Sequence, residues 1–108
     1  MKTLKDWKTW LDEKGALYKE TNDDICVINN DAFEYFREAF GDDKTIDDFI
    51  SQEFQYVTRT KAPIFRHISD IKSNVLYCAQ LAHVEFKDDR EIDMIIIGTL
   101  LEDYIRRA

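Results

Sequence analysis

The chain has 108 residues, of which 44% are hydrophobic and 34% charged, and its formal net charge is −7. This length predicts one domain spanning residues 1–108, and the apolar fraction favours a folded core over disorder. The acidic balance argues against direct binding to nucleic acid, which needs clustered Lys and Arg, and against adsorption to anionic membranes.

The N-terminal stretch has no uninterrupted apolar segment, so the sequence predicts a cytoplasmic protein without a signal peptide. No segment reaches the roughly 18 apolar residues that a membrane span requires. Cys26 and Cys78 lie far apart in the sequence and form no CxxC pair. We expect two reduced, partly buried thiols, and the alternative is a single disulfide between them.

The first part of the chain predicts a helix followed by a hairpin. Thr3 and Asp6 have capping-box spacing, and Gly15 marks the end of the helix. A β-branched run after a polar turn predicts a hairpin that pairs residues 17–20 with residues 25–28. The alternative is an extended segment without a partner strand. Two strands alone are marginal, so the hairpin must pack on helices.

Two more helices are predicted in the middle of the chain. Asn29 or Asn30 is the cap of a helix over residues 31–40. Thr45, with Asp48 three residues later, begins a third helix. The apolar face of this third helix consists of Ile46, Phe49, Ile50, Phe54 and Val57.

The last part of the chain predicts two long helices. Pro63 suits the first turn of a helix that runs to about Glu85, because its missing N–H costs nothing there. The apolar stripe of this helix is Ile64, Ile68, Ile71, Val75, Cys78 or Ala79, and Ala82. A fifth helix is predicted from residue 89 to residue 106, with acids at its start and arginines at its end, as the helix dipole favours. Its isoleucine run alone would also suit a strand. Gly98 interrupts it, which suggests that another backbone passes close.

The expected fold is therefore mainly α: a compact, bundle-like domain of about five helices with a small β-hairpin near residues 17–28. The fifth helix is apolar on two sides, whereas a surface helix needs only one apolar face. The first side carries one set of residues, Ile92, Ile95, Ile96 and Thr99, and the second side carries another set, Met94, Ile97, Leu101 and Ile105. We expect the second set to be covered by another protein chain, first of all by a second copy. The rival interpretation is a central core helix in a monomer.

Carboxylates are densest between Gly41 and Glu53. Most acidic pairs in the chain stand at predicted helix starts, where they stabilise the dipole. The remaining cluster consists of Asp42, Asp43, Asp47, Asp48 and Glu53, against the single Lys44. It lacks the central Gly and the alternating oxygen ligands of a calcium loop, so no metal site is expected. We expect this cluster to bind a basic protein surface, with Trp10 as an exposed aromatic anchor.

Two smaller groups of residues also have a chemical interpretation. His67 with Asp70 has the spacing of an acid–base pair, but an ordinary pair on a helix surface is favoured because no nucleophile or third ligand is evident nearby. Arg59, Lys61 and Arg66 form a basic island that suits a phosphate, although a solvated connector is favoured because no glycine-rich cradle accompanies it. No catalytic motif occurs, so neither enzymatic activity nor a cofactor is expected.

In its general profile of size, acidity and aromatic content, the chain resembles small inhibitors and immunity proteins of bacteria and their phages, including anti-restriction and anti-CRISPR proteins. The resemblance implies a non-enzymatic inhibitor that engages a basic surface of a target protein, such as a nucleic-acid-handling enzyme. The alternative is a homodimeric helical scaffold or regulatory subunit, in which the acidic charge serves only solubility.

Overall fold

The computed structural model describes residues 1–52 and 62–105. This part of the chain contains five helices and one three-stranded antiparallel sheet, in the order β1-β2-β3. The helices are α1 (Leu4–Glu13), α2 (Asn30–Phe40), α3 (Ile46–Ser51), α4 (Ile68–Leu81) and α5 (Asp89–Asp103), and the strands are β1 (Tyr18–Thr21), β2 (Asp24–Ile28) and β3 (Phe65–His67). The fold is thus mixed α and β, and the expected helical bundle is not what the structure shows.

Local capping begins three of the helices where the sequence predicts. Thr3 and Asp6 exchange side-chain and backbone hydrogen bonds at the start of α1. Thr45 and Asp48 repeat this reciprocal pattern at the start of α3. The side chain of Asn29 caps α2. Each cap needs only residues that are three apart in the chain, which is why the sequence alone identifies it.

The predicted hairpin is confirmed, with boundaries that differ by one residue. β1 pairs antiparallel with β2, and Thr21 lies opposite Asp24. The two residues between them, Asn22 and Asp23, have φ values of 29° and 63°. Asn and Asp tolerate this left-handed region better than other side chains, so they suit the tight two-residue turn that matches the twist of a hairpin.

The sequence does not predict the third strand. Residues 65–67 pair antiparallel with residues 26–28, on the edge of β2 that faces away from β1. Pro63 therefore precedes a strand rather than beginning a helix, and α4 begins at Ile68 and ends at Leu81, not near Glu85. Because β2 is almost entirely buried, the backbone groups on its second edge need hydrogen-bond partners, and β3 supplies them.

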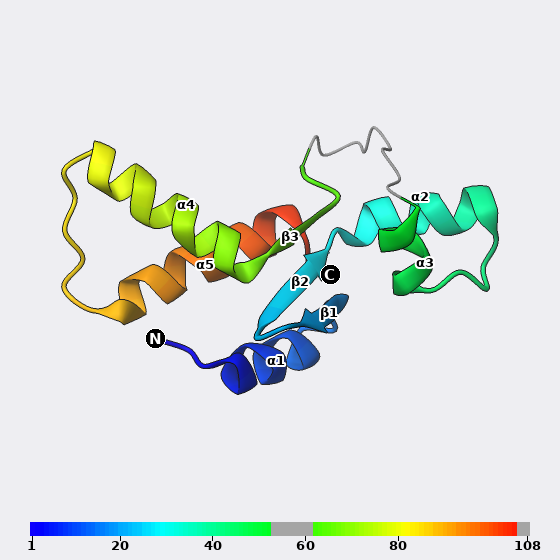
Figure 1. Ribbon diagram of the computed structural model, residues 1–108, viewed down its shortest axis with the longest axis horizontal. Coiled ribbons are helices and arrows are strands. Elements are labelled where there is room, and N and C mark those ends of the chain that lie inside the picture. Colours follow the sequence, from blue (N-terminus) through cyan, green and yellow to red (C-terminus); the bar gives the residue numbers. More distant parts are fainter. Residues whose placement is uncertain (53–61, 106–108) are drawn as a thin grey trace.

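The two faces of β2 contribute to two separate cores, since successive side chains of a strand point to opposite faces. Ile25 and Val27 pack into a first core with α1, α4 and α5. Cys26 and Ile28 pack into a second core with α2 and α3. The α4–α5 hairpin and the α2–α3 pair consequently extend toward opposite ends of the molecule (Figure 1). The molecule is 47 Å long and its radius of gyration is 14.7 Å, against about 13 Å for a compact chain of this length.

Asn29 connects the half of the molecule that contains α2 and α3 with the half that contains α5. Its backbone N–H donates to the carbonyl of Ile64 (2.8 Å), and its side-chain Nδ2 donates to the carbonyl of Asp103 at the end of α5 (2.9 Å). The side chain is only 2% exposed. The start of α2 is therefore fixed to both the segment before β3 and the end of α5.

The isoleucine-rich segment is a helix, as predicted, but it ends at Asp103 and not at residue 106. Ile92, Ile96 and Leu100 form its buried side in the first core, whereas Ile95 is 43% exposed. No helix in the described residues is both long and apolar enough to cross a membrane. Phe54 and Val57, predicted for the third helix, lie outside the described residues.

Candidate interaction surfaces

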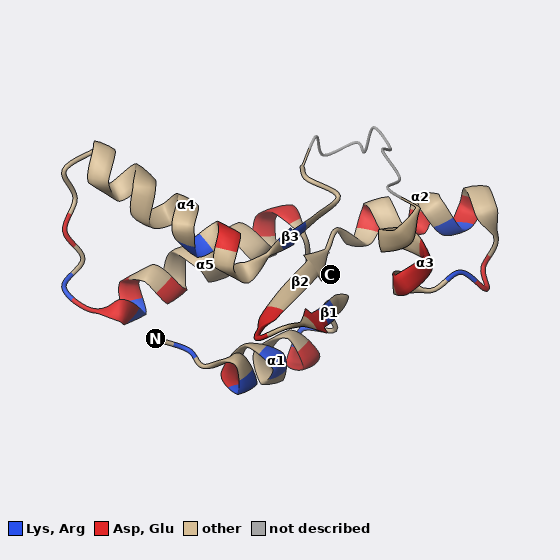
Figure 2. Cartoon of the chain, in the orientation of Figure 1, with Lys and Arg blue, Asp and Glu red and all other residues tan. Residues whose placement is uncertain are grey.

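The acidic lobe, which we define as residues 30–52, comprises α2, α3 and the connector between them. It carries seven acidic and only two basic side chains. Figure 2 shows the acidic positions distributed over both helices and the connector, at the end of the molecule away from the α4–α5 hairpin. Much of the net charge of the chain is therefore concentrated at one end.

The predicted acidic cluster lies in this lobe, but its members differ in their surroundings. Asp42, Asp43 and Asp47 are exposed, and Asp47 forms an ion pair with Lys19 of β1. Asp48 is committed to the cap of α3, where hydrogen bonds with the backbone and side chain of Thr45 hold the pKa of its carboxyl below the ordinary value. Glu53 lies outside the described residues. Three of the five predicted carboxylates are thus well placed to meet a partner.

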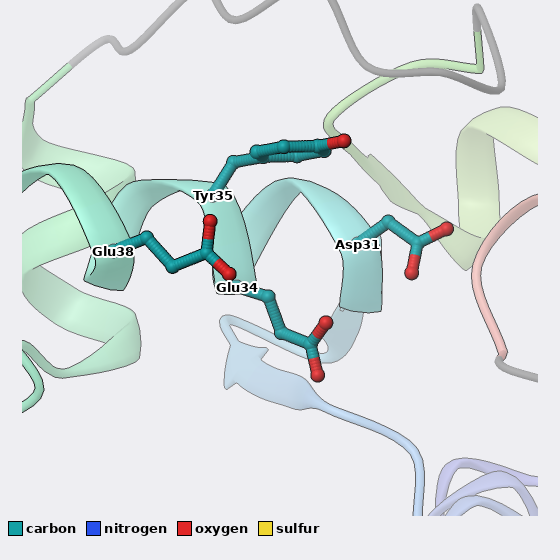
Figure 3. A pocket seen from close by; sticks show the side chains of 4 residues that line it. All are labelled: Asp31, Glu34, Tyr35 and Glu38. Atoms are coloured by element: carbon teal, nitrogen blue, oxygen red, sulfur yellow. The ribbon is translucent and has the colours of Figure 1, made fainter.

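The sequence interpretation missed a second acidic row, along α2. Asp31, Glu34 and Glu38 line a shallow hollow of about 260 Å³ together with Tyr35. Figure 3 shows the three carboxylates following one another along the helix, with the ring of Tyr35 beside them. Their spacing of three and four residues would have revealed the row from helical periodicity. Asp31, Glu34 and Tyr35 also make further contacts in the protein. No group of three potential ligands in the described residues is arranged to hold a metal ion.

Trp10 does not accompany the acidic lobe. Its half-buried ring packs against the first core and stands edge-on to Trp7, with ring centroids 6.1 Å apart. It lines a groove of about 530 Å³ between α1 and α5, where Met94 and Ile97 also lie. The structure therefore brings Trp10 together with two residues that the sequence assigned to self-association.

The four residues predicted for self-association do not form one exposed strip. Met94 is 66% exposed, but Ile97 and Leu101 are half-buried against the first core. Ile105 is only 7% exposed and belongs to that core. Whether the chain self-associates, and through which surface, stays a prediction, but Ile105 is too buried to take part in such a contact.

Most of the large hydrophobic side chains that are exposed in the described residues lie instead on the α4–α5 hairpin. A groove of about 430 Å³ runs between the two helices, and its walls include Val75, Cys78 and Ala79 of α4, Val84 and Phe86 of the connector, and Ile95 of α5. The sequence places these apolar residues of α4 on one stripe. Only its first part, Ile68 and Ile71, is buried, because the rest of the helix extends beyond the sheet.

The other predicted groups have more ordinary surroundings. His67 Nδ1 and the nearer Asp70 oxygen are 3.8 Å apart, and both side chains are exposed. This distance is too long for a hydrogen bond, so the pair is a weak surface contact. Arg66 lies on β3, whereas Arg59 and Lys61, the other members of the basic island, lie outside the described residues.

Both cysteines are free thiols, as predicted, but the expected partial burial is wrong for Cys78, which is exposed. Cys26 is buried in β2, and this burial raises the pKa of its thiol to about 11. Cys78 is exposed on the wall of the α4–α5 groove.

No family model matches the chain, and no curated protein or solved structure matches it either. Its function must therefore be inferred from its own surfaces.

Proposed function

We propose that this chain is a non-catalytic regulator that binds a target protein, and that its acidic lobe engages a basic surface of that target and blocks it. The observation that carries the proposal is the concentration of charge in the lobe. Residues 30–52 hold an excess of five acidic side chains in a chain whose net charge is −7. A surface of one sign attracts a surface of the opposite sign and orients it during the encounter.

The geometry of the lobe supports this role. Exposed carboxylates lie on the connector and on α3, and a second acidic row follows α2. The lobe is one end of an elongated molecule, so it can enter a concave surface of a partner (Figure 1). Enzymes that handle nucleic acids present basic surfaces to rows of phosphates, and a row of carboxylates has the same sign of charge. We therefore expect a target of that kind.

The decisive variant removes the three exposed charges of the predicted cluster: Asp42→Asn, Asp43→Asn and Asp47→Asn. Asp48 is left in place because its loss would disturb the cap of α3. The matched control is Glu13→Gln, Asp23→Asn and Asp70→Asn, which removes three exposed charges elsewhere. Both variants change the net charge from −7 to −4, so they are matched in total charge and differ in the place of the missing charges; the lobe variant also removes the ion pair of Asp47 with Lys19.

The target is captured from a native lysate on the immobilised chain, and its affinity for each purified variant is then measured at several salt concentrations. Each exposed pair contributes roughly 0.2 to 1 kcal/mol, so three together weaken binding on the order of tenfold. The lobe variant should also show a shallower dependence on salt, while the control stays near the parent. Equal losses in both variants, or no loss in the lobe variant, would contradict the proposal.

A second candidate, a homodimeric scaffold or regulatory subunit, is favoured by the apolar groove between α4 and α5. The groove lies at the opposite end of the molecule from the acidic lobe. An inhibitor that binds its target through the lobe can therefore also use the groove to form a dimer.

A further inference from the structure

The α4–α5 hairpin contains a long segment without formal charge. The twelve residues 73–84 include no Asp, Glu, Lys or Arg, although 34% of the chain is charged. Within this segment Tyr77 is 59% exposed, Leu81 is 64% exposed and Val84 is 51% exposed. Figure 2 shows the second half of α4 without a charged position. Depletion of charge together with exposed aromatic and aliphatic side chains is characteristic of the centre of a protein interface.

The exposed side chains and the groove lie side by side on this hairpin. Asn74 and Cys78 line the groove on the α4 side. Tyr77 and Leu81 follow them by three residues each, so they form a ridge along the rim of the groove. The same short element therefore carries both an apolar ridge and an apolar hollow.

Gly98 marks a gap in the opposite rim. It is exposed near the middle of α5, three residues after Ile95 of the groove wall. The sequence suggests that another backbone passes close to it, but no described atom lies within 4 Å of the position that a Cβ would occupy. A glycine there weakens the helix, and the described part of the chain makes no use of the space that it leaves.

We propose that two copies of the chain meet at this groove. The ridge of Tyr77 and Leu81 in one copy enters the groove of the other beside Gly98, and the second copy does the same in return. A two-fold interface requires a surface that is complementary to itself. A hairpin that carries both ridge and hollow meets this requirement, and the missing side chain at Gly98 lets the partner helix approach closely.

The charge distribution favours a second copy as the occupant. Two chains of net charge −7 repel one another, so they can associate only through a surface that adds little charge to the contact. Residues 73–84 and the walls of the groove form such a surface, because none of the residues that line the groove is charged. The hairpin lies at the opposite end of the molecule from the acidic lobe (Figure 2). Pairing through the hairpin would keep the two acidic lobes far apart and accessible to a target.

The available area is sufficient for a weak dimer. Four side chains of the ridge and groove, Tyr77, Leu81, Val84 and Ile95, are between 43% and 64% exposed. With roughly 200 Å² for each fully exposed large side chain, they contribute on the order of 400 Å² per copy. The remaining residues of the groove walls bring the area buried by two copies to about 1,000 Å², which is the minimum for a biological interface. We therefore expect a reversible dimer with a micromolar dissociation constant.

Sedimentation of the full chain tests the proposal directly. The parent should change from monomer to dimer between roughly 1 and 100 µM. The variant Tyr77→Glu with Leu81→Glu places two charges on the ridge and should weaken the dimer at least hundredfold. The matched control is Leu76→Glu with Gln80→Glu, which adds the same charges to exposed positions on another side of α4. It should change the dissociation constant by less than threefold, and circular dichroism should show that both variants are folded.

The thiol of Cys78 provides an independent measurement because it lies on the groove wall while Cys26 is buried. Its reaction rate with a maleimide should fall as the concentration of the parent rises, and should not change with concentration in the ridge variant. A parent that stays monomeric at about 100 µM, whether or not another protein occupies the groove, would overturn the proposal. So would a thiol reaction rate that is independent of parent concentration, or equal losses in the ridge variant and its control. None of these measurements involves the acidic lobe, so they stand or fall separately from the proposed function.

Discussion

Replacing Asn29 with alanine should destabilise the fold far more than an average substitution. The Asn29 side chain is 2% exposed and forms two hydrogen bonds. Oδ1 accepts from the backbone of Ala32 (3.1 Å), which caps α2, and Nδ2 donates to the carbonyl of Asp103 (2.9 Å), which holds the end of α5. Alanine removes both bonds and leaves two backbone groups without their partner.

The expected loss follows from these two contacts. Removal of an N-cap side chain costs about 1 kcal/mol. Leaving a carbonyl such as that of Asp103 without its donor in a partly buried site costs roughly 1 to 3 kcal/mol more. The free energy of unfolding should therefore fall by about 2 to 4 kcal/mol, which is large for a single substitution. Asn29→Ser separates the two contributions, because the serine hydroxyl can cap α2 but is too short to reach Asp103.

Urea titration followed by tryptophan fluorescence, at about 1 µM so that association does not contribute, measures both variants. We expect Asn29→Ser to lose roughly 1 to 3 kcal/mol, because it keeps the cap of α2 and loses only the bond to Asp103. If the alanine variant loses less than about 1 kcal/mol, Asn29 does not join the two ends of the molecule as described. If the serine variant is as stable as the parent, the bond to Asp103 contributes nothing.

Three further predictions follow from the geometry. Gly98→Ala should raise the stability of the monomer by about 1 kcal/mol in a urea titration, because nothing in the described structure obstructs the new methyl group. The same substitution should weaken the dimer in sedimentation. A monomer that is less stable than the parent would contradict the first expectation. At neutral pH the native chain should react with Ellman's reagent at Cys78 alone, because burial raises the pKa of Cys26 to about 11. In denaturant both thiols should react. Reaction of both thiols in the native chain would refute the prediction. Burial raises the pKa of the Asp24 carboxyl, but its hydrogen bonds with the Ser69 side chain and with two backbone amides outweigh burial and hold the pKa below 3.8. These bonds therefore stabilise the fold above pH 3.8 and lose their effect as the pH falls through the lowered pKa. The difference in the free energy of unfolding between the parent and Ser69→Ala should consequently shrink in acid. A difference that does not depend on pH would show that Asp24 is not responsible.

The sequence by itself determined the features that depend on near neighbours. Each capping residue forms a hydrogen bond with a residue three positions later, so the caps can be predicted from the sequence alone. These residues are Thr3, Thr45 and Asn29. The β1–β2 hairpin could also be predicted from near neighbours, because a two-residue turn fixes its register. The high acidity of residues 42–48 is likewise a local property of the sequence, although the engagement of Asp48 in a cap and of Asp47 with Lys19 required the structure.

Only the tertiary structure decided which apolar surfaces are buried. α5 is apolar around much of its circumference, so periodicity could not orient it; its contact with the sheet and with α4 buried Ile92 and Ile96 and left Ile95 exposed. β3 consists of three residues that pair with a strand about forty residues earlier, a contact too distant for any local pattern to record. Because β3 takes up residues 65–67, α4 begins later than predicted and its second half extends past the sheet. The apolar groove exists for that reason, since a stripe that would be buried in a bundle has nothing in the described chain to cover it.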